Sequence, residues 1–131
     1  MEKRIVSVGL VGFGLDTYWT QFEGLYERLC GYQDQIANLM ENTNVRVVNV
    51  GIVDNPVTAR KCADSLQKEG ISLLFLYIST YALSSTVLPL VMQLKVPVVL
   101  LNVQPEAAIR YDYLNGLGDR GKMTGEWLAY C

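Results

Sequence analysis

A glycine-rich stretch near the N-terminus is the first feature of the sequence that could do chemistry. Gly9, Gly12 and Gly14 end an apolar run in the sequence GLVGFG. Such loops cradle phosphates when glycines spaced GxGxxG open a helix and an acid follows about 20 residues later. Here the spacing is GxxGxG, Asp54 lies forty residues beyond Gly14, and Asp16 would place a negative charge where a pyrophosphate docks. The glycines therefore favour a tight strand-to-helix turn over a nucleotide site.

The hydroxyl side chains that could act as nucleophiles lack a partner to activate them. The sequence contains no histidine, the commonest general base and metal ligand in proteins. The hydroxyl-rich stretch at residues 79–85 therefore cannot provide a serine hydrolase triad. It also lacks the aspartate that a phosphorylated receiver domain would need at the end of its third strand. We expect no catalytic residue in this chain.

Acidic, aromatic and amide side chains occur near predicted strand ends. The acids Asp16, Asp54 and Glu106 can converge at one edge of a sheet, or they can be solvated loop acids and helix caps. Rings pack against the apolar faces of sugars, and amides bind sugar hydroxyls. For Tyr18 and Trp19, packing in the first turn of a helix is the alternative to sugar binding. The set that indicates sugar recognition is Tyr18, Trp19, Tyr77, Tyr81, Asn102 and Gln104.

Composition limits the partners and the location. The formal net charge is −2 and the basic residues form no cluster, so we expect no nucleic acid or membrane partner. Cys30, Cys62 and Cys131 form no CxxC pair, so neither a zinc site nor a disulfide framework is expected, and a cytoplasmic location fits. Residues 71–92 carry no charge and are long enough to span a membrane. Hydroxyl residues lie in their middle, however, where a membrane-spanning helix would be most apolar, so we expect no such helix here.

Four apolar runs, rich in β-branched residues, predict buried strands. Apolar residues at helical spacing separate these runs and predict three helices. Asp16 or Thr17 can cap the first helix, which Gly24 or Gly31 can interrupt. The second helix begins at Asn55-Pro56 and ends near Gly70, and the third begins at Ser84 or Ser85. The strands lie within Arg4–Gly14, Val45–Val53, Ile71–Ile78 and Val96–Val103.

This alternation predicts an α/β fold. We expect a three-layer sandwich with a Rossmann/flavodoxin-like parallel sheet of at least four strands and helices on both faces. No repeat or linker interrupts the chain, so residues 1–131 are predicted to be a single domain. Residues 107–131 carry four glycines and end in WLAYC, and we expect them to begin a connection to the missing part of a longer protein. Ligands of such sheets bind at the carboxyl ends of the strands.

The segment Thr80–Asn115, TYALSSTVLPLVMQLKVPVVLLNVQPEAAIRYDYLN, is similar to the N-terminal domain of the L-arabinose isomerases, within the L-fucose/L-arabinose isomerase group. Members share a Thr-containing loop after the third strand, a helix, a K-P step, an apolar strand and an H-T-Q-F-N-like motif. That motif falls on Asn102–Glu106, where Gln104 matches and Asn102 replaces the histidine. The last two positions also depart from the motif, which favours a related branch of the family over L-arabinose itself as the substrate.

The resemblance implies a role for the chain. The family converts aldoses to ketoses through an enediol with a divalent metal, usually Mn²⁺, held by two glutamates and two histidines of later domains. The N-terminal domain supplies subunit packing and loops that close over a neighbour's active site. We therefore expect a substrate-binding and oligomerisation domain that binds no metal and is inactive alone, with the missing domains and further copies as partners. The expected sugar-binding residues are Gln104, Asn102, Asp16, Tyr18, Trp19, Thr80 and Tyr81.

A second interpretation is a module without chemistry. A sugar-binding or regulatory α/β domain resembling periplasmic binding proteins also needs no histidine and no metal ligands. The sequence beyond Cys131 separates the two interpretations. Paired glutamates and histidines there favour the isomerase, and a stop codon favours the module.

Overall fold

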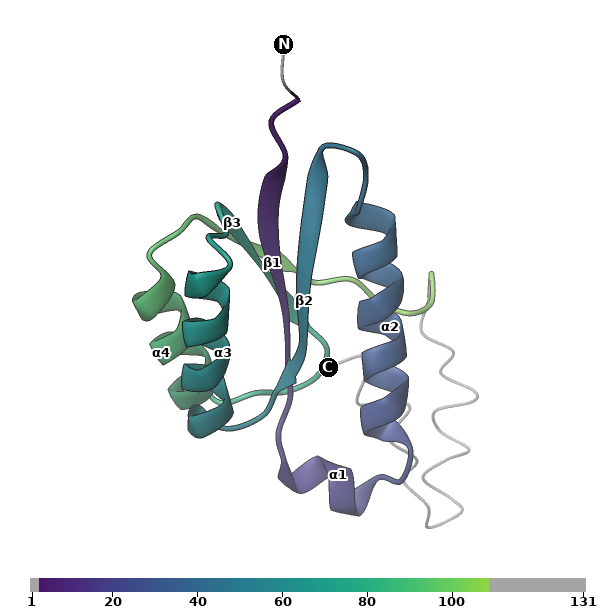
Figure 1. Cartoon of the computed structure of the whole chain (residues 1–131). Coiled ribbons are helices and arrows are strands. Elements are labelled where there is room, and N and C mark those ends of the chain that lie inside the picture. The colour runs from purple at the N-terminus through teal and green to yellow at the C-terminus, as the bar shows by residue number, and fades with distance from the viewer. Residues whose placement is uncertain (1–2, 109–131) are drawn as a thin grey trace.

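The computed structural model describes residues 3–108, which form a sheet flanked by helices (Figure 1). The elements confirm the predicted alternation, with one helix more than expected among these residues. In chain order they are β1 (Val6–Phe13), α1 (Thr17–Gln21), α2 (Leu25–Met40), β2 (Val45–Val53), α3 (Pro56–Lys68), β3 (Leu73–Ile78), α4 (Ser84–Leu94) and β4 (Val98–Leu101).

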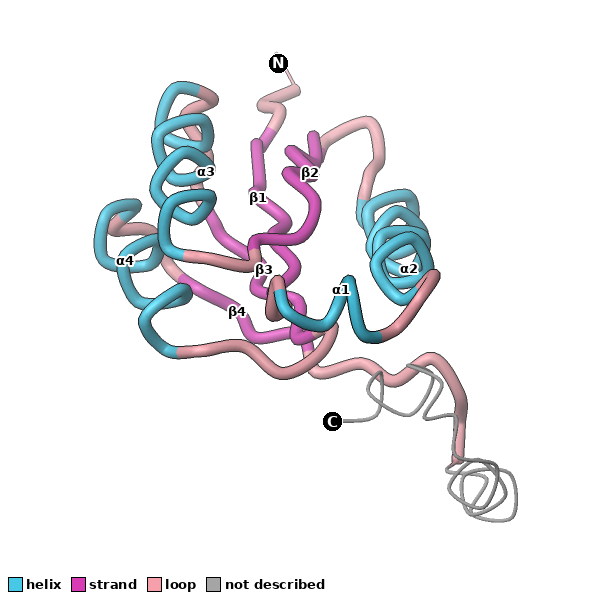
Figure 2. Tube along the Cα trace, turned by 90° about the horizontal axis from the view of Figure 1, so that it is seen from below, coloured by secondary structure: helices cyan, strands magenta, loops and turns pink. Residues whose placement is uncertain are grey.

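The four strands are parallel and lie in the order β2-β1-β3-β4. Helix α2 lies on one face of the sheet and α3 and α4 lie on the other (Figure 2), whereas the short α1 lies below the carboxyl ends of the strands (Figure 1). This arrangement confirms the predicted α/β sandwich with a Rossmann/flavodoxin-like sheet. Within residues 3–108, no helix is long and apolar enough to cross a membrane.

The core explains why the central strand is apolar on both faces. β1 lies between β2 and β3, and its residues 8–13 are all buried. Val11 and Phe13 join the cluster beneath α3 and α4, whereas Leu10 joins Tyr77 and Ala37 on the α2 side. A strand covered by helices on both faces reads as a continuous apolar run, which is why the apolar run in the sequence located β1. The cluster beneath α3 and α4 also contains Leu66, Leu74, Leu76 and Leu90.

The three glycines of the GxxGxG stretch are sites of close packing. A Cβ atom added at Gly12 would lie 2.1 Å from Oε1 of Gln33, and one at Gly14 would lie 2.6 Å from Cη2 of Trp19. At Gly9, an added Cβ would lie 2.9 Å from a side-chain methyl group. Real Cβ contacts are not this short, so a side chain added at any of the three positions would force the neighbouring side chain to shift. These contacts give the glycines a structural role that involves no phosphate.

A buried amide connects α2 to an irregularity in β2. Gln33 is fully buried, and its Nε2 donates to Oδ1 of Asn49 at 2.8 Å and to the carbonyl oxygen of Gly51 at 2.9 Å. Asn49 in turn donates from Nδ2 to Oδ1 of Asp34 at 2.9 Å. Gly51 has a φ of +77°, and the pairing of β1 with β2 shifts register beside it. The network therefore holds a glycine bulge of the kind that bends an edge strand.

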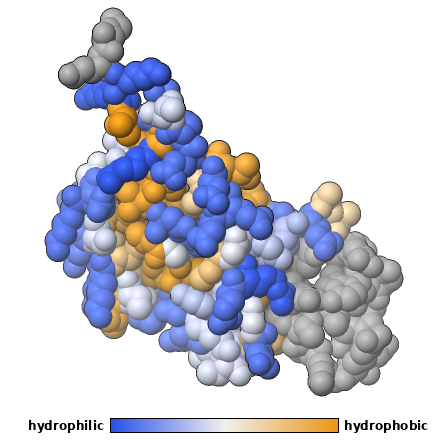
Figure 3. Space-filling model, turned by 45° about the vertical axis from the view of Figure 1, so that its right-hand side comes forward, coloured by the Kyte–Doolittle hydropathy of each residue, from blue (hydrophilic) through white to orange (hydrophobic). Residues whose placement is uncertain are grey.

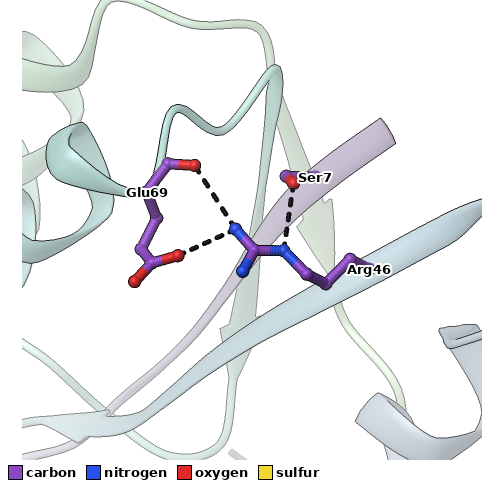
Figure 4. A network of polar contacts seen from close by, with 3 residues as sticks. All are labelled: Ser7, Arg46 and Glu69. Atoms are coloured by element: carbon purple, nitrogen blue, oxygen red, sulfur yellow. Dashed lines mark hydrogen bonds and ion pairs between the residues drawn. The ribbon is translucent and has the colours of Figure 1, made fainter. Parts of the chain in front are cut away.

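At the amino ends of the strands, the side chain of Arg46 connects β1, β2 and the end of α3. Arg46 donates from Nε to Oγ of Ser7 at 3.2 Å and from Nη2 to Oε2 of Glu69 at 2.8 Å (Figure 4). The side chains of this ion pair are 49% and 43% exposed, so water screens the attraction and its contribution to stability is small. The contacts connect β1 and β2 to the end of α3 at the edge opposite the predicted ligand site.

Three local expectations needed correction. The single predicted helix is two, because Gly24 has a φ of +77° and separates α1 from α2, whereas Gly31 lies inside α2. Asp16 occupies the N-cap of α1, but its side chain makes no capping hydrogen bond. β4 is shorter than the predicted Val96–Val103, because its pairing with β3 spans only residues 98–101.

Candidate functional site

The carboxyl ends of the strands meet at one edge of the sheet, which is seen from below in Figure 2. Gly14 follows β1, Asp54 follows β2, Ser79 follows β3 and Asn102 follows β4. The chain leaves β1 toward β2 and leaves β3 toward β4, so the connections diverge between β1 and β3. Such a topological switch point is where ligands of open α/β sheets bind.

Ser79 joins the two central strands at the switch point. Its side chain is 1% exposed, and its Oγ donates to the carbonyl oxygen of Phe13 across the 66 residues that separate them in sequence. The hydroxyl is therefore occupied in a structural hydrogen bond. This contact gives Ser79 a positioning role for the β1 and β3 ends.

An acidic and aromatic hollow lies beside α1 and the end of β2. It has a volume of about 570 Å³, and the described residues of its walls include three carboxyl groups and no basic side chain. Trp19 donates from Nε1 to Oδ2 of Asp54 at 2.8 Å, and its ring meets the Tyr26 ring edge-on at a centroid distance of 5.1 Å. The residues that line the hollow are Trp19, Thr20, Glu23, Gly24, Tyr26, Glu27 and Asp54.

Asp54 is fixed from two sides. Besides the bond from Trp19, its Oδ1 accepts from Nδ2 of Asn55 at 2.9 Å and from Oγ1 of Thr58 at 3.3 Å. Asn55 and Thr58 also form the capping box of α3, as the Asn55-Pro56 sequence predicted. The start of α3 therefore holds the carboxylate, and the carboxylate holds the Trp19 ring.

The hollow can offer both apolar surface and hydrogen-bond acceptors. The rings of Trp19 and Tyr26 provide the apolar surface, and the carboxylates of Glu23 and Glu27 provide the hydrogen-bond acceptors. Burial raises the pKa of Tyr26 above its ordinary 10.0, with smaller contributions from Cys30, Asp54 and Glu27. Its hydroxyl is therefore protonated at neutral pH, and its side-chain hydrogen bond is with Cys30.

A second, apolar hollow lies at the switch point itself, with a volume of about 360 Å³. Thr80 is 1% exposed and lies at its inner side, whereas Tyr81 is 53% exposed. The remaining walls are apolar, so this space suits a group without charge. The lining residues are Phe13, Leu76, Ile78, Thr80, Tyr81, Ala82, Val87 and Leu100.

The predicted sugar-binding residues are distributed over the edge of the sheet. Trp19 lines the acidic hollow, and Thr80 and Tyr81 line the apolar hollow. Asn102 and Gln104 are exposed on the segment that follows β4, and Asp16 is exposed at the start of α1. The ring of Tyr18 packs edge-on against Phe22 at 5.8 Å, which is the helix-packing role considered for it.

Sequence reasoning missed most of the acidic hollow. Asp54 was identified as a strand-end acid, but its bond to Trp19 joins residues 35 apart in sequence. Glu23, Tyr26 and Glu27 were not singled out. Gly24 was the feature of the sequence that could have indicated this hollow. The helix breaks at Gly24, and Glu23 and Glu27 on either side of it line the same hollow.

Comparisons with known proteins assign no family to this chain, so any function must be argued from the residues described above. Neither a scan against protein-family models nor a search of curated proteins finds a match. Within residues 3–108, no three His, Cys, Asp or Glu side chains are placed to share a metal ion.

Proposed function

We propose that this chain is the N-terminal, sugar-binding domain of a metal-dependent aldose–ketose isomerase of the L-arabinose/L-fucose type. The observation that carries the proposal is the hollow in which Asp54 fixes the ring of Trp19 beside the carboxylates of Glu23 and Glu27. The fold and the resemblance of Thr80–Asn115 to that family support it. The same resemblance implies that the metal would be held by glutamates and histidines of later domains.

The residues of the hollow have complementary roles in this proposal. The rings of Trp19 and Tyr26 contact the apolar face of the sugar, and Glu23 and Glu27 accept hydrogen bonds from its hydroxyls. Asp54 contributes by holding Trp19 in place before the sugar binds, which lowers the entropy cost of binding. The chain binds and orients, and the chemistry occurs in the assembled protein.

Tryptophan fluorescence tests the proposal on the chain itself. The sequence has two tryptophans, so Trp127→Phe leaves only Trp19 and Trp19→Phe leaves only Trp127. Titration with L-arabinose or L-fucose should change the emission of the Trp127→Phe protein and leave that of the Trp19→Phe protein unchanged. An equal response in both, or no response in either, would contradict the assignment of the hollow.

The carboxylates are tested by a conservative change. Glu23→Gln keeps the size of the side chain but removes its charge, and should weaken sugar binding about tenfold, because hydrogen bonds to charged groups are the stronger ones. Glu41→Gln, an exposed position on another part of the surface, is the matched control and should leave the affinity unchanged. Equal affinities in all three proteins would remove the carboxylate from the site.

The isomerase part of the proposal is tested on the full-length protein with Mn²⁺. A panel of aldopentoses and 6-deoxyhexoses should yield a ketose from at least one of them. Gln104 and Asn102 are proposed as further sugar contacts in the assembled enzyme, so Gln104→Ala should raise KM. Sugar binding without turnover on any aldose would instead favour the non-catalytic module, and an unchanged KM would remove Gln104 from the site.

A further inference from the structure

The side-chain hydrogen-bond donors around the acidic hollow already have partners. Trp19 donates from Nε1 to Oδ2 of Asp54 at 2.8 Å. Thr20 donates to a carbonyl oxygen within α1 at 3.3 Å, and the hydrogen bond of the Tyr26 hydroxyl is with Cys30. These three are the lining side chains that can donate a hydrogen bond, among the described residues of the walls. The hollow therefore offers a ligand few donors.

The acceptors of the hollow are carboxylates. Glu23 and Glu27 are exposed on either side of Gly24, and an ionised carboxylate accepts hydrogen bonds but donates none. Asp54 adds a third negative charge, and the described lining has no basic side chain to balance it. A sugar hydroxyl both donates and accepts, so these walls match only its donor side. A protonated amine has three donors and no acceptor, so it complements them fully.

The aromatic rings of the hollow favour the same group. A cation is attracted to the face of a Trp or Tyr ring when it lies within about 6 Å of the ring centre. The rings of Trp19 and Tyr26 have their planes inclined by 69°, so they form two adjacent walls and not a stack. The lower end of the molecule, where α1 lies in Figure 1, is mostly hydrophilic or near neutral (blue and white) in Figure 3. A charged ligand can therefore approach this end without crossing an apolar surface.

We propose that the acidic hollow binds its ligand through a protonated amino group, so that the sugar class it selects is an amino sugar. The ammonium group donates to Glu23 and Glu27 and lies against the rings of Trp19 and Tyr26. Asp54 holds Trp19 in place and adds negative charge. The inference rests on the proposed function for the sugar part of the ligand, and it adds a positive charge that L-arabinose and L-fucose lack.

The placement of the carboxylates suits an organic cation better than a metal ion. They line a space of about 570 Å³, and within residues 3–108 no three acidic, cysteine or histidine side chains are placed to share one ion. Asp54 also uses both carboxylate oxygens in bonds to Trp19, Asn55 and Thr58. A metal ion needs several oxygen ligands at one point. A molecule the size of a sugar can instead contact the acids and the rings around its own surface.

Three sugars that differ at one position test the inference. L-Fucosamine carries an ammonium group where L-fucose carries a hydroxyl, and N-acetyl-L-fucosamine carries a neutral amide there. Each is titrated into the 131-residue Trp127→Phe chain, whose emission reports Trp19, at about pH 6, where the amine is protonated and the carboxylates are ionised. L-Fucosamine should bind at least about tenfold more tightly than either neutral sugar. Added salt should weaken the binding of L-fucosamine alone, and magnesium chloride without sugar should leave the emission unchanged.

Substitutions locate the preference in the hollow. Glu23→Gln with Glu27→Gln should abolish the preference for L-fucosamine over L-fucose. The matched control, Glu41→Gln with Asp64→Asn, makes the same change in net charge at exposed positions elsewhere and should keep the preference. Tyr26→Leu should weaken L-fucosamine binding about two- to fivefold, whereas Tyr26→Phe keeps the ring and should not. Circular dichroism checks that each variant is folded, since Glu27 also lies in the first turn of α2.

The outcomes separate this inference from the proposed function. Equal affinities for L-fucosamine and L-fucose, or a preference that survives the double glutamine variant, would overturn the inference and leave the sugar site in place. A response to magnesium alone that equals the response to L-fucosamine would also overturn it. Binding of L-fucosamine without binding of L-fucose would support the inference and exclude a neutral sugar as the ligand. No response to any of the three sugars would overturn the proposed function and the inference together.

Discussion

Gly12 illustrates how one residue type can serve packing where the sequence pattern suggests a ligand. Its Cα lies against Oε1 of the buried Gln33, and that oxygen has no hydrogen-bond partner among the described residues. Gly12→Ala should therefore destabilise the chain by about 1–3 kcal/mol through overpacking. Gly31→Ala is the control, because its added Cβ meets nothing within 4 Å inside α2, and it should stabilise by up to about 1 kcal/mol.

Urea unfolding measures both effects, and a double-mutant cycle identifies the cause. In a Gln33→Ala background the added methyl of Gly12→Ala has space, so its cost should fall by at least about 1 kcal/mol. An equal cost in both backgrounds would show that the backbone of β1, and not Gln33, resists the substitution.

Cys62 gives the stability of the chain a dependence on alkaline pH. Burial raises the pKa of its thiol from the ordinary 9.0 to about 12. Between these values the unfolded chain loses the proton and the folded chain keeps it, so stability is fully present below pH 9 and falls as pH rises toward 12. The slope contributed by one thiol is at most about 1.4 kcal/mol per pH unit.

Urea unfolding of the natural chain and of Cys62→Ala at pH 8 and pH 10.5 measures this contribution. Every other titratable group is the same in the two proteins, so the difference between the two slopes reports the thiol. The free energy of unfolding of Cys62→Ala should fall less between the two pH values. Parallel slopes would show that Cys62 ionises in the folded state as easily as in the unfolded state.

Trp19 and Asp54 show how much of the site the sequence could predict. Each was identified separately, one as an aromatic residue after the first strand and the other as an acid after the second. Their bond depends on β1 and β2 being neighbours, which follows from strand order and not from local pattern. Gln104 was identified as an amide after the fourth strand and again by resemblance, and its exposed position after β4 leaves its role to the assembled protein.

At the scale of elements, the sequence indicated a helix break equally at Gly24 and at Gly31, but the helix breaks only at Gly24. Gly24 adopts a φ of +77° and ends the helical run, whereas Gly31 continues α2. Helix propensity assigns both the same cost. The decision comes from packing, because α1 must turn to place Trp19 over Asp54 before α2 can lay Leu25 and Leu29 on the sheet.

The start of α3 was predictable because its signal is local. The Asn55 side chain accepts from the backbone N–H groups of Val57 and Thr58, both at 3.0 Å, and Pro56 occupies the first turn. Asn55→Ala should cost about 1 kcal/mol, within the usual range for a lost N-cap. Thermal unfolding measures the change in melting temperature.

Asn38→Ala, at an exposed position within α2, is the matched control for Asn55→Ala, since it removes an asparagine that caps nothing. It should leave the melting temperature unchanged or raise it slightly. If both substitutions had the same effect, the capping hydrogen bonds would contribute nothing to stability. Because Asn55 also donates to Asp54, its loss should weaken sugar binding as well.

At the scale of the whole molecule, the fold was predictable because every strand is mostly apolar and the two central ones, β1 and β3, are covered on both faces. These properties make four apolar runs stand out from the helices between them. α1 did not stand out, because it has five residues, none of them buried, and its polarity gives no periodic signal. The same lack of burial predicts that stability is unevenly distributed over the chain.

Amide hydrogen exchange should reveal this distribution. β1 lies between two strands with residues 8–13 buried, so its amides should exchange only on global unfolding. α1 has no buried residue and no side-chain cap, so its amides should exchange through local opening at a free energy well below that of global unfolding, although the bond from Trp19 to Asp54 keeps the open form a minor one. Low urea concentrations separate the two mechanisms, because they should accelerate exchange in β1 and leave α1 unchanged. Equal protection in α1 and β1 would show that the Trp19–Asp54 contact couples α1 to the global fold, and the acidic hollow would then be a rigid part of the core.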